Sequence, residues 1–252
     1  MSTILAIANQ KGGVGKTTTA INLGAGLGAL ERRVLLVDCD PQGNASRGLG
    51  VKVAPPHLYH AISGEVPLEQ TIRSTGFPNL DIVPSQRDLV GLEVELVGEE
   101  GWEGHLKSVL AQVADRYDII LLDCPPSLGH LTVNALAAAD GLLVPLQCEY
   151  FALEGISELM STVKRIQGGV NPHLGIAGIL LTMYDDRTNL SKDVADEVRR
   201  HFAGKVFETI VPRNIRLAEA PSHGLPIFQY DIKSRGADAY LALAREYLRR
   251  AA

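Results

Sequence analysis

Short, strongly apolar runs alternate along the chain with longer segments whose apolar residues recur every three or four positions. The short runs predict β-strands at residues 3–8, 33–38, 80–83, 117–123, 141–146, 176–182 and 206–211. Several are apolar at nearly every position, as in 34–37 and 119–122, which is typical of strands buried on both faces. The pattern therefore indicates a mostly parallel sheet covered by helices on both sides.

The longer segments predict helices between these strands, at residues 16–30, 89–115, 131–138, 154–168, 191–202 and 236–250. Such alternation of strands and helices is the signature of a doubly wound α/β fold, whose ligands bind beyond the carboxyl ends of the strands. Residues 55–76 are interpreted as an irregular excursion that is too short to form a domain. We therefore expect residues 1–252 to form one domain, with its chemistry in the segments that follow the strands.

Composition favours a folded, cytoplasmic protein. Hydrophobic residues make up 46 % of the 252 positions and charged residues 21 %, which is enough to bury a sizeable core. No apolar run approaches the roughly 18 residues of a membrane-spanning helix, and residues 1–8 lack the charged start and cleavage site of a signal peptide. Cys39, Cys124 and Cys148 show no short C-x-x-C spacing, so we interpret them as reduced, mostly buried thiols.

A glycine-rich segment, Lys11-Gly12-Gly13-Val14-Gly15-Lys16-Thr17-Thr18-Thr19, follows the first predicted strand and opens the first predicted helix. This is the context of a P-loop, whose backbone N–H groups and helix N-terminus bind the phosphates of ATP. Lys16 is then expected at the β- and γ-phosphates, Thr17 at Mg²⁺ and Thr18 near the α-phosphate. The segment departs from the usual pattern because Gln10 replaces the first glycine and a second lysine, Lys11, follows it.

Three aspartates stand at the ends of predicted strands. Asp38 and Asp123 each end an apolar strand, as in the Walker B arrangement, so both are expected near Mg²⁺ and its water shell. Asp40 lies two residues beyond Asp38, on the same side of an extended segment. We expect Asp40 to orient a water molecule for attack on the γ-phosphate. Ordinary turn chemistry is the alternative for Asp38 and Asp123.

Five separated motifs resemble those of the ParA/Soj chromosome- and plasmid-partition ATPases, a deviant-Walker P-loop family that is related to the cell-division regulator MinD. The motifs are residues 9–19 (NQKGGVGKTTT), 40–44 (DPQGN), 123–128 (DCPPSL), 147–155 (QCEYFALEG) and 212–224 (PRNIRLAEAPSHG). The resemblance covers nearly the whole chain, and five matches make it highly specific. It implies the doubly wound P-loop fold and the hydrolysis of ATP with Mg²⁺.

The resemblance also implies residue roles and partners. Lys11 is similar to the signature lysine that reaches across an ATP-sandwich homodimer to the partner's phosphates, and Asp40 is similar to the residue needed for hydrolysis. Pro212 and Asn214 resemble parts of an adenine-binding loop. Members of this kind bind nonspecific double-stranded DNA as ATP-bound dimers on the nucleoid, and a ParB-type (Spo0J-like) partner stimulates their ATPase.

A DNA-binding face is implied in the last quarter of the chain. Its expected members are Arg187, Lys192, Arg216, Lys233 and Arg235. From Arg187 onward the formal charge is +4, whereas the rest of this chain of net charge −5 carries −9, which favours a local phosphate-binding surface. Leu225 departs from close Soj relatives, which commonly carry a lysine there. Local salt bridges are the alternative for Arg187 and Arg216.

Three other functions share parts of this pattern. A MinD-like membrane-associated regulator needs a C-terminal amphipathic helix that lies on lipid. The helical stripe that this function would use is Ala237, Tyr240, Leu241, Ala244, Tyr247 and Leu248. A carrier similar to the nitrogenase iron protein needs two cluster cysteines, for which Cys124 and Cys148 are the candidates. A metabolic ATP-dependent ligase or kinase of this fold needs a second substrate pocket.

Overall fold

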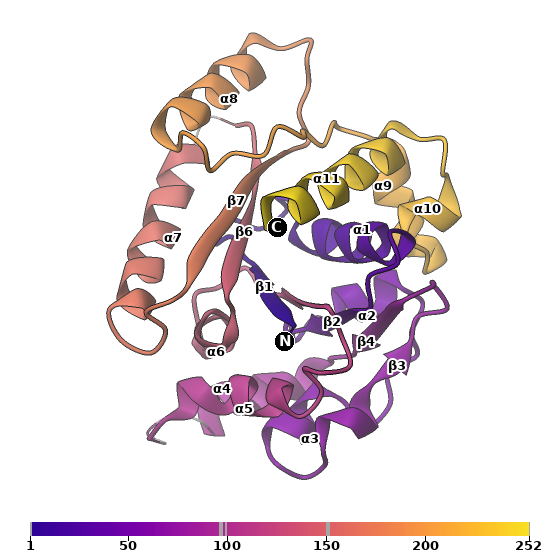
Figure 1. Cartoon of the computed structure of the whole chain (residues 1–252), viewed down its shortest axis with the longest axis vertical. Helices are drawn as coiled ribbons and strands as arrows, with labels where there is room; N and C mark the ends of the chain where they lie inside the picture. Colours follow the sequence, from indigo (N-terminus) through magenta and orange to yellow (C-terminus); the bar gives the residue numbers. More distant parts are fainter. Residues whose placement is uncertain (1, 96–97, 99, 150–151, 252) are drawn as a thin grey trace.

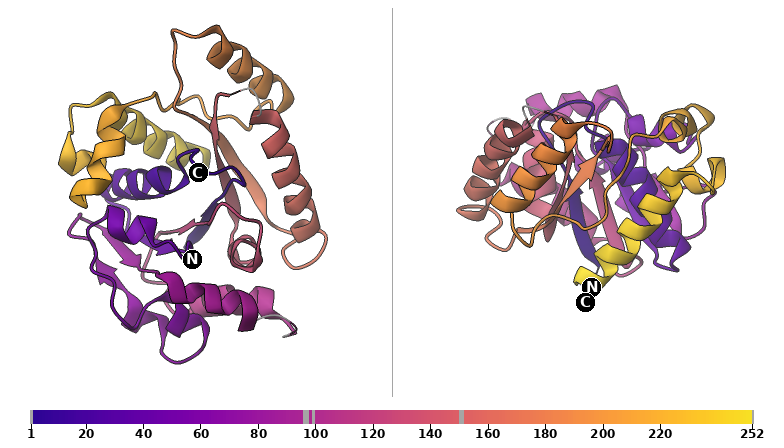
Figure 2. Two further views of the ribbon diagram at one scale, coloured as in Figure 1. Left: turned by 180° about the vertical axis from the view of Figure 1, so that it is seen from behind. Right: turned by 90° about the horizontal axis from the view of Figure 1, so that it is seen from above.

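The computed structural model describes residues 2–95, 98, 100–149 and 152–251, and within them a seven-stranded sheet lies between layers of helices (Figures 1 and 2). The strands are β1 Thr3–Ile7, β2 Val34–Asp38, β3 Arg73–Ser74, β4 Leu80–Val83, β5 Ile119–Asp123, β6 Gly141–Gln147 and β7 Gly175–Thr182. Their order is β3-β4-β2-β5-β1-β6-β7. All neighbours are parallel except β3 and β4, which confirms the doubly wound, mostly parallel fold.

Helices cover both faces of the sheet. They are α1 Lys16–Ala29, α2 Asn44–Gly48, α3 Leu58–Ile62, α4 Val90–Glu95, α5 His105–Ala111, α6 His130–Ala138, α7 Ala152–Gln167, α8 Asn189–His201, α9 Ile215–Glu219, α10 Ile227–Tyr230 and α11 Arg235–Ala251. Helices α1 and α11 pack on one face, and α5, α6 and α7 pack on the other, as Figures 1 and 2 show.

The apolar strands are apolar throughout because each of their two sides meets a separate core. In β2, Val34 and Leu36 belong to the core under α1 and α11, whereas Leu35 and Val37 belong to the core under α5 and α6. Successive side chains of a strand point to opposite faces, so a strand between two helical layers has no polar face. This is the physical basis of the parallel-sheet prediction.

The C-terminal helix α11 packs on α1, and its apolar side is buried. Tyr240 and Tyr247 are 1 % and 5 % exposed, and the Tyr240 hydroxyl lies 3.1 Å from Oγ1 of Thr19 on α1. Gly26 of α1 permits this approach, because a Cβ added there would lie 3.1 Å from the Cβ of Ala244. The stripe that a membrane-binding helix would present to lipid is thus used inside the protein. No helix among the described residues is long and apolar enough to span a membrane.

The predicted strand at residues 206–211 is wrong. The N–H groups of Phe207 and Val211 donate to carbonyls of β7, at 2.9 Å each. Between them, however, the N–H of Thr209 donates to the buried carboxylate of Glu246 at 2.8 Å. Because this donor is diverted to a side chain of α11, the segment forms one isolated bridge with β7, between Val206 and Ile179, and no continuous ladder.

The predicted helix at residues 89–115 is also wrong as a single element. The structure has α4 and α5 there, separated by Gly98 and Gly101 in left-handed conformations, with φ of 85° and 79°. Glycine weakens a helix interior, and positions 96, 97 and 99 of the expected helix lie outside the described residues. The excursion at residues 55–76 contains α3 and β3. The remaining predicted elements begin and end within two residues of the observed ones.

Candidate functional site

The loop between β1 and α1 borders open space at the carboxyl end of the sheet. Gly13 and Gly15 have left-handed backbones, with φ of 76° and 88°, which only glycine adopts without strain. A Cβ added to Gly12 or Gly13 would meet no atom within 4 Å, so no protein atom fills the space beside them. The Thr182 hydroxyl donates to the carbonyl of Val14 at 2.8 Å, which ties the loop to the end of β7.

Lys16, the first residue of α1, is 7 % exposed and its Nζ donates to the carbonyl of Lys11 at 3.0 Å. Burial lowers the pKa of Lys16, while the charge of Asp123 opposes that shift. A hollow of about 370 Å³ lies beside it, lined by Gly12, Gly13, Gly15, Lys16, Thr17, Thr18, Ile21, Asp40, Asn44, Pro126, Met183 and Pro221. We call this the phosphate hollow. Of the predicted residues 11–18, all but Lys11 and Val14 line it.

Asp38 and Asp123 stand side by side, because β2 and β5 are neighbours in matching register. Both residues are 0 % exposed. Asp38 Oδ2 accepts hydrogen bonds from the backbone and hydroxyl of Ser46, at 2.9 and 2.7 Å. Among the described residues, neither oxygen of Asp123 has a partner in hydrogen-bonding geometry, although the Thr17 hydroxyl lies close enough to influence the Asp123 pKa.

The electrostatics of this aspartate pair fit a divalent cation. Burial raises the pKa of both carboxyls, and the charge of Asp38 adds to that effect at Asp123. A cation with oxygen ligands would satisfy the bare oxygens of Asp123 and offset the buried charge. Thr17, at the start of α1, supplies a hydroxyl on the same side of the phosphate hollow.

Asp40 lines the phosphate hollow, whereas Asp38 and Asp123 are not among its lining residues. It is 7 % exposed, and its Oδ1 accepts from the N–H of Gln42 at 2.9 Å. Its carbonyl accepts from the Ser85 hydroxyl at 2.9 Å. Gln42 thus orients the side chain of Asp40 and Ser85 its backbone, and Asp40 lines the same hollow as Lys16 and Asn44.

A second, more enclosed hollow adjoins the first and is mostly apolar. Its volume is about 280 Å³, and its lining is Gly15, Thr18, Thr182, Met183, Val211, Pro212, Arg213, Asn214, Ile215, Leu217, Ala218 and Tyr240. It contains both residues of the expected adenine-binding loop, Pro212 and Asn214. Met183 has a φ of 49°, a conformation uncommon for a residue other than glycine. Apolar walls with a few polar groups are suited to a flat heterocyclic base.

Sequence reasoning gave no binding role to most of the residues that line this base hollow, among them Met183, Leu217 and Tyr240. Met183 was within reach, since it follows a predicted strand whose carboxyl end should carry chemistry. Leu217 and Tyr240 gave no signal, because their helical spacing is that of ordinary core residues. Asn214 has a second role, since its Oδ1 accepts from the N–H of Arg216 at 2.8 Å and caps α9.

Lys11 lies next to the phosphate hollow but does not line it. Its ammonium forms an ion pair with Glu149, at 2.6 Å between Nζ and Oε2. Glu149 belongs to the family-like motif at residues 147–155, in which no residue was assigned a role. Tyr150 and Phe151 of that motif lie outside the described residues.

The expected DNA-binding arginines are exposed but engaged. Arg187 is 81 % exposed, and its Nε and Nη2 donate to the two carboxylate oxygens of Asp185 at 2.8 and 2.7 Å. Arg216 is 54 % exposed and lies 2.9 Å from Glu219 and 3.4 Å from Asp231. The salt-bridge alternative therefore describes their geometry. Exposed pairs of this kind are weak, so phosphates can compete for both arginines.

Three chain segments that carry the basic residues meet on one surface. Arg235, at the start of α11, lines a hollow of about 320 Å³ with Tyr184, Asp186 and Pro212. Arg216 reaches Asp231, two residues before the exposed Lys233. The structure thus brings parts of residues 184–187, 212–216 and 231–235 together, and Lys192 is exposed on α8, which begins two residues after Arg187. Leu225 is half-buried.

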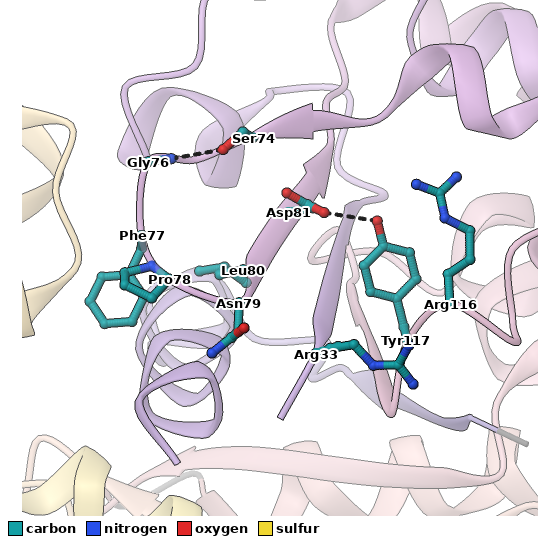
Figure 3. A pocket seen from close by; sticks show the side chains of 10 residues that line it. All are labelled: Arg33, Ser74, Gly76, Phe77, Pro78, Asn79, Leu80, Asp81, Arg116 and Tyr117. Atoms are coloured by element: carbon teal, nitrogen blue, oxygen red, sulfur yellow. Dashed lines mark hydrogen bonds between the residues drawn. The ribbon is translucent and has the colours of Figure 1, made fainter. Parts of the chain in front are cut away.

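Another hollow lies at the opposite end of the strands (Figure 3). It holds about 490 Å³ and is lined by Arg33, Ser74, Gly76, Phe77, Pro78, Asn79, Leu80, Asp81, Arg116 and Tyr117. Figure 3 shows Arg33 and Arg116 beside Tyr117, whose hydroxyl donates to Asp81 at 2.9 Å. The lining comes from the amino ends of β2, β4 and β5, so a molecule there could not reach the phosphate hollow.

The cysteines are free and buried, as predicted. Cys124 and Cys148 are 1 % and 5 % exposed. Burial raises the pKa of Cys148 to about 11 and raises that of Cys124 further, so both thiols stay protonated near neutral pH. A cluster held between two subunits would need sulfurs at the surface, and this pair does not provide them.

Comparisons with known proteins agree with this geometry. Residues 2–176 match the family model described as "AAA domain". The chain is 54 % identical to the chromosome partitioning protein ParA of Myxococcus xanthus, over 98 % of this chain and 88 % of that one. It is 52 % identical to the sporulation initiation inhibitor protein Soj of Bacillus subtilis, over 98 % of both chains. A crystal structure of cobyrinic acid a,c-diamide synthase from Mycobacterium smegmatis with bound ADP and magnesium is 38 % identical, with a TM-score of 0.87 over 99 % of this chain and 95 % of that one.

Proposed function

This chain belongs to the ParA/Soj family of chromosome-partitioning ATPases, and we propose that it acts as an ATP-gated clamp on DNA. Two protomers join face to face around two molecules of ATP and Mg²⁺, and the dimer binds double-stranded DNA with little sequence preference. A ParB-type partner then stimulates hydrolysis, which separates the protomers and releases the DNA. Residues 1–252 act as one ATPase domain, and the protein is associated with the nucleoid in the cytoplasm.

The observation that carries the proposal is the pair of hollows that meet at Thr18. One is lined by three glycines, Lys16 and the hydroxyls of Thr17 and Thr18, which suit phosphates, and the other is more apolar and more enclosed, which suits a base. Lys11 stands at the rim of the first without entering it. Within its own protomer this cation is paired with Glu149 outside the hollow, in a half-exposed ion pair that another nucleotide can replace.

Within one protomer, the groups around the two hollows each have a separate role in binding ATP. The N–H groups of residues 12–16 and the N-terminus of α1 hold the phosphates, and the Lys16 ammonium offsets charge at the β- and γ-positions. Mg²⁺, held near Thr17, Asp38 and Asp123, supplies further positive charge when bound. Pro212 and Asn214 help to enclose the base. Phosphoryl transfer depends mainly on such positioning and charge neutralisation.

Asp40 is proposed to orient the attacking water. Asp40→Ala should keep ATP binding and dimerisation, because Lys11 and Lys16 remain. Its turnover should fall by about a hundredfold or more, the range in which removal of a positioned proton acceptor acts. Phosphate release measured under saturating ATP tests this. Asp40→Asn, which retains the bond from Gln42, should be equally slow. Wild-type turnover in either variant would remove Asp40 from the mechanism.

Arg216 is proposed to contact DNA phosphates. Arg216→Glu replaces attraction by repulsion twice per dimer, so it should abolish detectable DNA binding at 100 mM salt. ATP-dependent dimerisation should persist, because Arg216 is not among the residues that line the phosphate hollow. Fluorescence anisotropy with a labelled duplex measures the first effect, and light scattering measures the second.

The matched control is Arg33→Glu. Arg33 is 55 % exposed and paired with Asp118 at 3.0 Å, close to the exposure and pairing of Arg216, but it lies at the amino ends of the strands. The control changes the net charge equally and should retain most of the DNA binding. Full binding by Arg216→Glu, or equal loss in both variants, would count against this face.

Two alternative functions lose support on specific grounds. The membrane-associated regulator needs a free apolar stripe on α11, and that stripe is packed on α1. The metabolic ligase needs a second substrate within reach of the γ-phosphate, whereas the hollow of Figure 3 lies at the other end of the sheet. Identity to the named partition proteins also exceeds identity to the diamide synthase, 54 % and 52 % against 38 %.

A further inference from the structure

The side chain of Lys11 is held inside its own protomer. Its Nζ lies 2.6 Å from Oε2 of Glu149, and the two side chains are 38 % and 45 % exposed. The backbone of Lys11 stays with the phosphate loop, because its N–H donates to Oδ1 of Asn9 and its carbonyl accepts from Lys16, at 3.0 Å each. The main chain of Lys11 thus belongs to the phosphate loop, while its ammonium is bound to Glu149.

Each of the two carboxylate oxygens of Glu149 has its own hydrogen-bond partner. Its Oε1 accepts from the side-chain amide of Gln147, the last residue of β6, at 2.5 Å, which leaves Oε2 for Lys11. The side chain of Asn9 also donates to the carbonyl of Pro145 in β6 at 2.7 Å. The loop that carries Lys11 is therefore hydrogen-bonded to β6, the strand that ends two residues before Glu149.

We propose that Glu149 is a positioning residue that holds Lys11 in the unpaired protomer and so opposes pairing of two protomers. The inference rests on the proposed function, in which Lys11 serves the partner's nucleotide. To do so, the ammonium must leave Glu149. A triphosphate presents more negative charge than a diphosphate, so it competes better with one carboxylate. Glu149 thereby adds a cost to pairing that the charge of the γ-phosphate helps to offset.

The expected size follows from the exposure of the pair. A half-exposed ion pair changes an equilibrium constant by up to about fivefold. Two pairs are broken for each dimer formed, so Glu149 weakens pairing by up to about 25-fold, and we expect about tenfold. Its removal should strengthen pairing with the diphosphate by a similar factor, so that dimers form at lower protein concentration with either nucleotide.

Glu149→Gln is the test, and Glu69→Gln is its matched control. Glutamine keeps the shape of Glu149 and the acceptor for Gln147, so a purely structural role predicts no change. Glu69 forms an equally short ion pair with Arg116, at 2.6 Å, away from the phosphate hollow. Sedimentation with a non-hydrolysable ATP analogue should give about a tenfold lower dissociation constant for the Glu149→Gln dimer and no change for Glu69→Gln. ATP affinity of the protomer should be unaltered.

A second readout needs no dimer. In dilute, nucleotide-free protein, an amine-reactive ester should acylate Lys11 several-fold faster in Glu149→Gln than in wild type, measured by peptide mass spectrometry. Unchanged labelling would show that Glu149 does not restrain Lys11. Unchanged or weaker pairing of Glu149→Gln would show that Glu149 does not oppose dimer formation. If labelling rises but the wild type never pairs, the hold stands and the sandwich dimer of the proposed function fails.

Discussion

Lys16→Ala should abolish ATP binding. Lys16 is 7 % exposed and lines the phosphate hollow, so its ammonium offsets phosphate charge where water cannot replace it. A hydrogen bond to a charged group contributes about 1.5–3 kcal/mol. Two such contacts correspond to a loss of about two to four orders of magnitude in affinity. Isothermal titration calorimetry with Mg-ATP measures this loss directly.

The matched control for Lys16→Ala is Lys107→Ala, which removes an exposed lysine of α5 on the other face of the sheet. It should bind ATP as the wild type does, and circular dichroism should show both variants folded. Unchanged ATP affinity in Lys16→Ala would contradict the assignment of the glycine-rich loop as the phosphate site.

Lys11→Ala should bind ATP and yet fail to form dimers. Lys11 lies outside the phosphate hollow of its own protomer, so its loss leaves ATP affinity intact. In the dimer it places a cation at the partner's phosphates, in the manner of an arginine finger that is worth about 10³–10⁵ in rate. Partner-stimulated turnover should therefore fall by about three orders of magnitude or more. Light scattering with a non-hydrolysable analogue measures assembly.

Loss of Lys11 also leaves Glu149 without its cation, but a half-exposed carboxylate tolerates this at small expense in stability. Lys11→Ala should therefore unfold at nearly the wild-type temperature. ATP-dependent dimers of Lys11→Ala at wild-type concentrations would refute the role across the interface.

The parts of the fold that the sequence predicted well are those with a local cause. A strand such as β5 is recognisable because both of its sides are buried, which forces a continuous apolar run. Residues 206–211 have the same pattern, but their ladder is interrupted by Glu246, which lies in a helix 37 residues beyond Thr209. A contact between residues so far apart in the chain cannot be predicted from the local sequence pattern.

The candidate site divides in the same way. The phosphate loop is one contiguous segment whose backbone needs glycine at fixed positions, so its glycines and Lys16 can be recognised from the sequence alone. The base hollow is assembled from the end of β7, the 211–218 segment and α11, and only the topology of the sheet brings them together. The ion pair between Lys11 and Glu149 spans 138 positions and has the same explanation.

The central claim, that ATP gates nonspecific DNA binding, is tested most directly by a salt titration of binding with ATP, with ADP and without nucleotide, on two unrelated duplexes. If each protomer neutralises about three phosphates, the ATP-bound dimer should show a slope of log K against log salt near −5, and the monomer a slope near −3. Between 50 and 200 mM salt, the dimer should then lose about a thousandfold in affinity and the monomer about sixtyfold. We predict the steeper slope with ATP alone and equal affinity for both duplexes. A slope that is the same in all three nucleotide states, or a strong preference for one duplex, would contradict the account.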